Sequence, residues 1–169
     1  MIFLILLTFS HVCDGQVIYD GSSAGHTTFP GDIPVTVTTL DLSNNSLTAV
    51  SQADLTAFTL LEVIDLSHNR ITTVDVDSLL NTRIEDMNLA HNDLTSIPDF
   101  NYNVSPLRFL DVSHNMISSI PSDSINSGQP EEELDVSYNP LDWLAGDLEG
   151  LNGVTTLTHL DLSGTNCSE

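Results

Sequence analysis

A nine-residue phrase recurs six times in this chain, and this repeat constrains the fold more than any other feature. The copies begin at Val37, Leu61, Ile84, Leu107, Glu131 and Leu157 and read VTTLDLSNN, LEVIDLSHN, IEDMNLAHN, LRFLDVSHN, EEELDVSYN and LTHLDLSGT. Successive copies start 23 to 26 residues apart. A fixed period of about 20–50 residues is typical of solenoids, in which each repeat buries its apolar side only against its neighbours.

Within the phrase, the first, fourth and sixth positions are apolar in every copy, with Glu131 as the single departure. Apolar–polar alternation of this kind predicts a short strand with one buried face. Because stacked repeats place equivalent segments side by side, the strands should form one parallel sheet with a spacing of about 4.7–4.9 Å.

The phrase has the form L-x-x-L-x-L-x-x-N, and from about Val37 onwards the chain resembles the extracellular leucine-rich repeat family, with repeats of the Toll-like receptor and secreted matrix type. The resemblance implies an α/β solenoid, a horseshoe with a parallel concave β-sheet of about six strands. It also implies mostly loops or short helical turns on the convex side. Leu55, Phe58 and Leu60 have a pattern that fits a helical turn, whereas the Ser-, Asn-, Gly- and Pro-rich stretch 122–130 predicts a loop.

The ninth position of the phrase is an asparagine in five copies: Asn45, Asn69, Asn92, Asn115 and Asn139. An amide both donates and accepts hydrogen bonds, so it can satisfy backbone groups that lose their partners where the chain leaves the strand. The resemblance implies a continuous ladder of these side chains, with Thr165 as a partial substitute in the sixth copy. Residues two and five positions further on should close the core beneath the turn: Leu47, Val50, Ile71, Val74, Leu94, Ile97, Ile117, Ile120, Leu141 and Leu144.

The chain divides into three segments. Residues 1–15 carry an apolar run that is too short to span a bilayer and is interpreted as a signal peptide. Residues 16–36, with the element FPGDIP, are similar to the N-terminal cap of extracellular family members but lack its disulfide cysteines. Residues 37–169 hold the six repeats, the last incomplete and without a C-terminal cap, which we interpret as a fragment, a short isoform or a truncated gene model.

Two cysteines and three glycosylation motifs bear on the environment of the protein. Cys13 falls near the expected cleavage site, and Cys167 is either a small buried residue or the partner of a cysteine in a missing cap. The N-x-S motifs begin at Asn44, Asn103 and Asn166, and behind a signal peptide they are glycosylation acceptors. These features predict a secreted or extracellular glycoprotein.

The charge of the chain excludes whole classes of partner. It has 24 acidic residues against 3 basic ones and a formal net charge of -21. Nucleic-acid binding relies on basic side chains that displace counterions, so we expect no nucleic-acid partner. The same charge disfavours anionic membranes, and no later stretch is long and apolar enough for a membrane span.

The third, fifth and seventh positions of the phrase are expected to face outward on the concave side, and the fifth forms a column of five Asp and one Asn. We predict a partner-binding surface there made by Asp41, Val63, Asp65, Asp86, Asn88, Phe109, Asp111, Glu133, Asp135, His159 and Asp161. The carboxylates would attract a basic partner, and Val63 with Phe109 would supply an apolar contact. The alternative is that the aspartates are solvated parts of the scaffold.

The eighth position holds His68, His91 and His114, which should stack on neighbouring turns. We interpret them as variation of the motif and predict no metal site, no cofactor and no catalytic residue, because the many Ser and Asp fall on repeat positions. The sequence therefore predicts a non-enzymatic, secreted or extracellular module that binds a protein ligand on its concave face. The alternatives are a structural matrix or cell-adhesion component and a truncated fragment of a Toll-like receptor.

Overall fold

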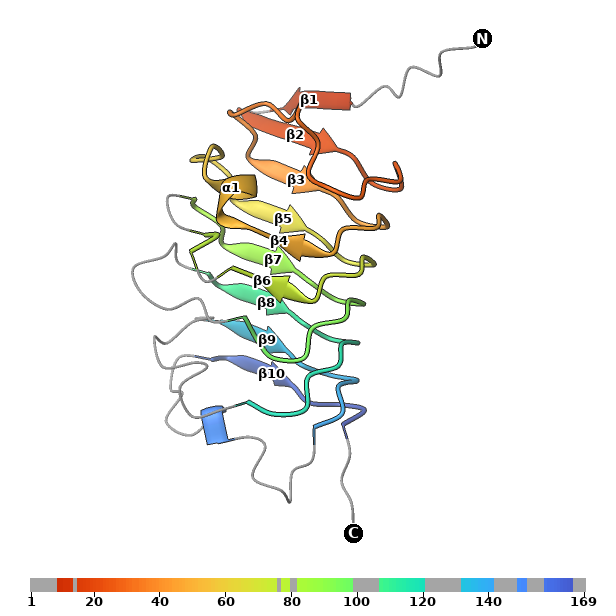
Figure 1. The fold of residues 1–169 in the computed structure, drawn as a ribbon. Coiled ribbons are helices and arrows are strands. Elements are labelled where there is room, and N and C mark those ends of the chain that lie inside the picture. The colour runs from red at the N-terminus through yellow and green to blue at the C-terminus, as the bar shows by residue number, and fades with distance from the viewer. Residues whose placement is uncertain are drawn as a thin grey trace.

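The computed structural model describes residues 9–13, 15–75, 77–79, 82–98, 107–120, 132–141, 149–151 and 157–165. Over these residues the chain winds into a solenoid whose turns stack along one axis from β1 to β10 (Figure 1). One sheet runs the length of the stack in the order β1-β2-β3-β5-β7-β8-β9-β10. Its strands are β1 (Phe9–Cys13), β2 (Gln16–Asp20), β3 (Thr39–Asp41), β5 (Val63–Asp65), β7 (Asp86–Asn88), β8 (Phe109–Asp111), β9 (Glu133–Asp135) and β10 (His159–Asp161).

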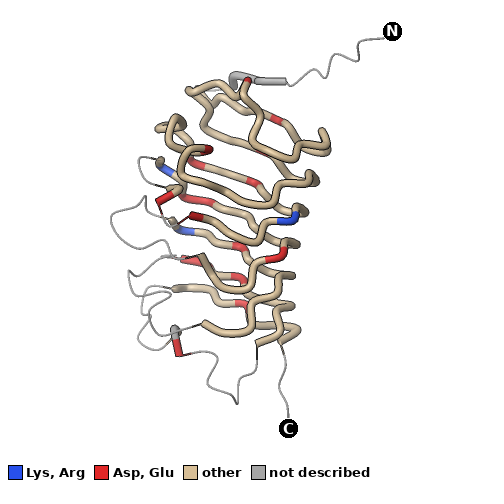
Figure 2. The backbone as a smooth tube through the Cα atoms, in the orientation of Figure 1, with Lys and Arg blue, Asp and Glu red and all other residues tan. Residues whose placement is uncertain are grey.

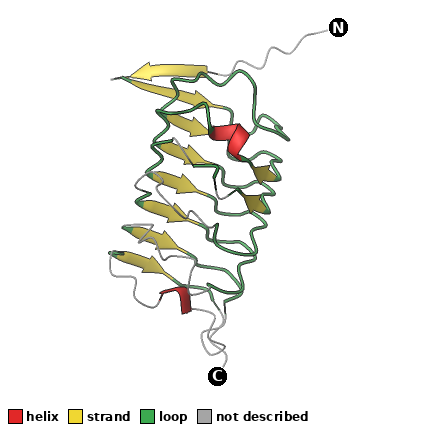
Figure 3. Cartoon of the chain, turned by 60° about the vertical axis from the view of Figure 1, so that its left-hand side comes forward, coloured by secondary structure: helices red, strands yellow, loops and turns green. Residues whose placement is uncertain are grey.

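The strands of the six repeats are parallel and in register, as the phrase predicts, so the predicted solenoid with its parallel sheet is confirmed. β2 adds a seventh parallel strand, and β1 joins its free edge in the antiparallel direction. The opposite side carries the short strands β4 (Ala49–Val50) and β6 (Thr73–Val74), one helical turn α1 (Gln52–Leu55) and the 3-10 turn η1 (Glu149–Leu151) (Figure 3).

The apolar positions of the phrase form the core between these two sides. The fourth and sixth positions of the first five repeats are all buried: Leu40, Leu42, Ile64, Leu66, Met87, Leu89, Leu110, Val112, Leu134 and Val136. On the convex side Leu55 and Phe58 are buried, but Leu60 is 39% exposed, contrary to its place in the predicted apolar pattern. The reason is a turn after α1, closed by the Leu61 N–H donating to the Phe58 carbonyl (3.1 Å), which makes Leu61 the buried residue.

The cap-like segment begins with an additional turn of the solenoid. Tyr19 pairs with Leu40, is only 2% exposed, and donates its hydroxyl hydrogen to Asp32 Oδ1 (2.9 Å). The His26 N–H donates to Asn45 Oδ1 (2.8 Å), as the eleventh residue of each of the first four repeats does to the next asparagine. Gly21 takes the place of an apolar sixth residue, because a Cβ there would lie 2.9 Å from both Leu42 Cδ2 and Tyr19 Cε1.

β1 lies inside the segment that we interpret as a signal peptide. It pairs with β2 from Phe9 opposite Asp20 to Cys13 opposite Gln16. Gly15, in the connection between the two strands, has a φ of +87°, a conformation that favours glycine. Cleavage near residue 15 would therefore remove β1 and leave β2 as the edge of the sheet.

None of the described helices has the length and apolarity of a membrane span.

Candidate functional site: the concave groove

The parallel register gathers the predicted binding residues into two columns on the concave face, the outer face of the sheet. The third positions align as Thr39, Val63, Asp86, Phe109, Glu133 and His159. The fifth positions align as Asp41, Asp65, Asn88, Asp111, Asp135 and Asp161, and β2 adds Asp20 at the head of this column. Acidic residues therefore follow the sheet from strand to strand, whereas basic residues are few (Figure 2).

A groove of about 400 Å³ lies over β5, β7, β8 and β9. Its lining includes eight of the predicted residues: Val63, Asp65, Asp86, Asn88, Phe109, Asp111, Glu133 and Asp135. Asp41, His159 and Asp161 belong to the same columns but lie outside the groove. Val63 and Phe109 are half-buried and stand on either side of Asp86, so the groove combines two apolar side chains with carboxylates.

Each fifth-position side chain ends its strand. Oδ1 of Asp41, for example, accepts a hydrogen bond from the N–H of Ser43, two residues further on, at 2.8 Å. The same bond forms at Asp20, Asp65, Asn88, Asp111, Asp135 and Asp161, at 2.8–3.0 Å. This is the turn that Asp and Asn favour, and it fixes the direction of each carboxylate. The repeat phrase alone does not reveal this role, although the Asn at position 88 indicates that an amide oxygen serves as well.

The seventh position does not face outward as predicted. Ser43, Ser67, Ala90, Ser113 and Ser137 are buried, and only Ser163, on the last turn, is exposed. The strands span just the third to fifth positions, so alternation between the two faces stops there. Beyond the strand, the bond to the fifth residue turns the chain, and the seventh side chain is enclosed between stacked turns.

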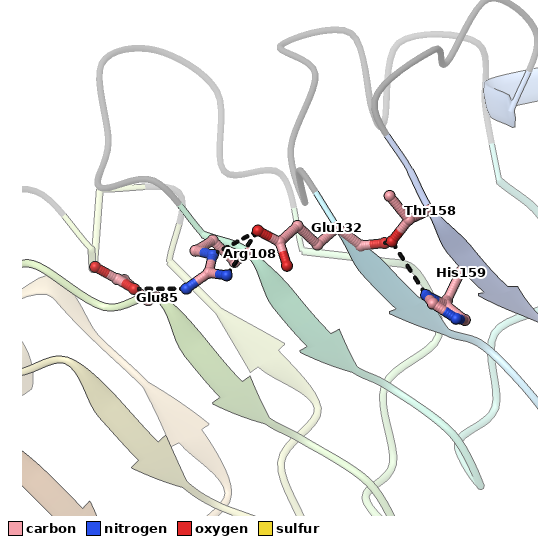
Figure 4. A network of polar contacts seen from close by, with 5 residues as sticks. All are labelled: Glu85, Arg108, Glu132, Thr158 and His159. Atoms are coloured by element: carbon pink, nitrogen blue, oxygen red, sulfur yellow. Dashed lines mark hydrogen bonds and ion pairs between the residues drawn. The ribbon is translucent and has the colours of Figure 1, made fainter.

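The surroundings of Asp86, at the start of β7, raise the pKa of its carboxyl group. Burial raises its pKa, and the negative charges of Glu85 and Glu132 raise it further, while Arg108 lowers it. Arg108 is held by two carboxylates, with Nη2 2.7 Å from Glu132 Oε1 and Nη1 3.3 Å from Glu85 Oε2 (Figure 4). Its guanidinium carbon lies 5.1 Å from the centre of the Phe109 ring.

This polar network runs along the residues that directly precede β7, β8, β9 and β10. The Thr158 hydroxyl donates to the Glu132 carbonyl (2.9 Å) and lies 3.1 Å from His159 Nδ1. Arg108 thus sets one positive charge against two glutamates, and the lining of the groove itself contains no basic residue.

The asparagines of the ninth position hydrogen-bond one turn to the next. Asn92 Nδ2 donates to the carbonyls of Leu66, Leu89 and Ala90 at 3.0–3.2 Å, and its Oδ1 accepts from the N–H of Ile71 at 2.9 Å. The same pattern of four bonds recurs at Asn45, Asn69, Asn115 and Asn139. Asn92, Asn115 and Asn139 are buried, and Asn45 and Asn69 are half-buried.

Of the predicted glycosylation sites, Asn44 is exposed and has a φ of 55°. Asn103, Asn166 and Cys167 lie outside the described residues, as does the side chain of Cys13. The part of the chain that the structure describes holds no group of three or more His, Cys, Asp or Glu arranged to bind a metal ion.

Comparison with known proteins finds family profiles and individual proteins that are similar to this chain. Residues 35–94 match the family profile "Leucine rich repeat", and residues 106–127 match a second profile, "Leucine Rich Repeat". The chain is 38% identical over 66 residues to Toll-like receptor 2 of Macaca fascicularis, which is 39% of this chain and 8% of that protein. It is 33% identical over 69 residues to Toll-like receptor 2 of Canis lupus familiaris, which is 41% of this chain and 9% of that protein.

Among solved structures, the fold is similar to that in the crystal structure of a TLR13–ssRNA13 complex, with a TM-score of 0.80. The sequences are 23% identical, and the match covers 94% of this chain but 23% of the other. The solved relative therefore supports the fold alone. The chain spans less than a tenth of the length of the curated relatives that it matches.

Proposed function

Because the chain is a leucine-rich repeat protein whose repeats are related to those of Toll-like receptors, we propose that it is an extracellular module that binds a protein with a basic surface in its concave groove. The observation that carries this proposal is the groove of about 400 Å³, in which Val63 and Phe109 lie among five carboxylates. We propose binding without catalysis, since the Ser and Asp of the phrase have structural roles in the turns.

The two kinds of side chain in the groove have different parts in binding. Carboxylates act over a distance and mainly raise the rate at which a basic partner arrives. Phe109 and Val63 provide apolar surface that leaves water when the partner docks, which mainly lowers the rate at which it departs. Because Asp65, Asp111 and Asp135 are already held by backbone hydrogen bonds, they need little reordering on binding.

A protein partner is favoured over RNA, although the solved relative is a complex with ssRNA. The lining of the groove contains Asp65, Asp86, Asp111, Glu133 and Asp135 and no Lys or Arg. Phosphate groups would be repelled by these carboxylates, and the net charge of -21 would oppose their approach from any side.

The extracellular location is part of the proposal and is supported by the apolar run within residues 1–15 and by the N-x-S motif whose asparagine, Asn44, is exposed. A second candidate is a fragment of a Toll-like receptor. The similarity to a small portion of Toll-like receptor 2 favours it, because these repeats would then form one part of a longer solenoid. The same groove would serve in either case.

The groove is tested by selecting peptides from a random library on the immobilised protein and measuring the binding kinetics of one enriched peptide. We expect enriched peptides to combine Lys or Arg with an apolar residue. Phe109→Ala should raise the dissociation rate at least about fivefold, the equivalent of ~1 kcal/mol for a central contact. Asp111→Asn with Asp135→Asn should slow association at low salt while keeping the strand-ending bond, as Asn88 does.

Matched controls lie outside the groove. Val35→Ala removes apolar surface from an exposed residue of the cap, and Asp93→Asn removes one exposed charge from a turn. Both should leave the kinetics unchanged. Enriched peptides without basic residues, or binding that is indifferent to all three groove substitutions, would place the binding site elsewhere.

A further inference from the structure

Four aromatic rings form a stack just beyond the C-terminal ends of the strands, at the eighth position of successive turns. The ring centres of His68 and His91 are 4.2 Å apart, those of His91 and His114 are 4.1 Å apart, and those of His114 and Tyr138 are 4.3 Å apart. The planes of adjacent rings differ by only 8–11°. Tyr138 is 55% exposed and all three histidines are exposed, so the stack is a surface feature.

The backbone holds these rings in place. All four residues have φ values of 53–55°, the left-handed conformation in which histidine is enriched and a bulky residue such as tyrosine is rare. The N–H of each donates to the carbonyl of the seventh residue of the next turn, at 2.8–3.0 Å, as from His91 to Ser113. Gly164 ends the stack, because a Cβ there would lie 2.5 Å from Tyr138 Cδ1.

The charges around the stack come from few groups. Partial desolvation and the neighbouring imidazoles of His114 and His68 lower the pKa of His91, whereas the carboxylate of Asp111 raises it. Arg70 and Asp93 follow His68 and His91 by two residues and are exposed to solvent. Tyr138 covers the outer face of His114.

From this geometry we propose that the His68, His91 and His114 rings form a proton-operated switch, stacked while uncharged at neutral pH and driven apart by proton uptake in mild acid. Imidazole is the side chain that ordinarily changes its charge between about pH 5 and 8. Neighbouring imidazolium ions on adjacent turns repel each other, and because the turns fix the backbone, relief comes from rotation of the side chains out of the stack.

The direction of the effect on stability follows from the lowered pKa of His91. The folded protein binds fewer protons than the unfolded chain between the ordinary histidine pKa of about 6.5 and the lower value in the fold. Stability is therefore unaffected by His91 above that ordinary value and declines as the pH falls from there through the lower pKa. A positive charge on His68 or His114 would disfavour proton uptake by His91, because neighbouring imidazolium ions repel each other.

The experiment follows the histidine and tyrosine ring protons of the full chain by NMR between pH 8 and pH 4.5. In the wild type, the Tyr138 ring protons should lose their ring-current shift in acid as the stack opens. The titration midpoint of His91 should rise towards the ordinary value in the His68→Asn, His114→Asn double variant. Asparagine suits this position because Asn44 occupies it in the first repeat with a φ of 55°.

Thermal unfolding at pH 7.5 and pH 5.0 gives a second readout. The His68→Asn, His91→Asn, His114→Asn triple variant should lose less of its melting temperature on acidification than the wild type. His159→Asn, outside the stack, should behave as the wild type does, and His91→Asn replaces the triple variant if that protein does not fold. An unchanged His91 midpoint in the double variant, or the same acid-induced loss of melting temperature with and without the three rings, would overturn the proposal.

Discussion

Replacing Asn92 by alanine tests how the stacked turns are held together in the middle of the solenoid. The side chain of Asn92 is 6% exposed and makes four hydrogen bonds to the backbone of two turns. Not all four bonds have the same weight, because some of the backbone groups have other partners.

The three carbonyls that accept from Asn92 keep a partner after the substitution. The Leu66 carbonyl still accepts from Asn69, the Leu89 carbonyl from Asn115, and the Ala90 carbonyl from the N–H of His68. The N–H of Ile71 loses its acceptor, Asn92 Oδ1. Leaving one buried backbone donor without a partner costs about 1–3 kcal/mol, so we expect Asn92→Ala to lower the free energy of unfolding by that amount.

The assay is urea unfolding followed by far-UV circular dichroism, with two comparison variants. Asn92→Asp keeps an acceptor for Ile71 but loses the amide donor and places a negative charge beside carbonyl oxygens, so it should cost more than the alanine. Asn45→Ala acts at the N-terminal end of the ladder, where the side chain is half-buried and water can replace its bonds, so it should cost less.

The test compares the free energies of unfolding of these three variants with one another and with that of the wild type. A free energy of unfolding of Asn92→Ala equal to that of the wild type would refute the structural role of the ladder. A loss in Asn45→Ala as large as that in Asn92→Ala would refute the reasoning from burial. A change in the urea m-value would indicate a change in the surface exposed on unfolding or a departure from two-state unfolding.

Three further predictions concern the groove, the cap and processing. Asp86→Asn should raise the free energy of unfolding at pH 7 by up to about 0.5 kcal/mol, and this gain should vanish in a thermal melt at pH 3. The reason is that the pKa of Asp86 is raised in the fold, so the stability falls as the pH rises from the ordinary pKa of 3.8 through the higher value. Tyr19→Phe should lower stability by about 0.5–1.5 kcal/mol in a urea titration through loss of the bond to Asp32, and an unchanged midpoint would contradict it. Protein expressed in animal cells should reach the medium without residues 1–15 and lose apparent mass on deglycosylation, whereas an intact cytosolic product would contradict the extracellular location.

The repeat predicts the sheet well because it permits only one register between neighbouring strands. The apolar residues at the fourth and sixth positions must all face the same side, and a slip by one residue would expose them. The columns of the concave face follow directly from that register. The groove around Val63 and Phe109 does not follow from the register, since its depth depends on side-chain sizes and packing that a repeat phrase does not specify.

Two features escaped sequence analysis for physical reasons. The additional turn of the cap has Gly21 and Ala24 at the sixth and ninth positions, so it lacks the residues by which the phrase is recognised. The eighth position was correctly aligned as a histidine column, but the contact of Tyr138 with His114 depends on a left-handed backbone, which a strand-based reading of the phrase does not foresee. Both follow from the turn after the strand and not from the strand itself.

The fifth-position aspartates carry a charge that their structural role does not require. Asn88 makes the same strand-ending bond through an amide oxygen, yet the other turns use Asp. Unit charges on adjacent strands, such as those of Asp111 and Asp135, are about 4.8 Å apart and repel by about 1 kcal/mol in water. Replacing Asp65, Asp111 and Asp135 by asparagine should therefore raise the free energy of unfolding and slow the association of a basic peptide at low salt. A loss of stability in this triple variant, measured by urea unfolding, would mean that the carboxylates are needed for the turns. A gain in stability without any loss of association would leave the charge of the column without a part in binding.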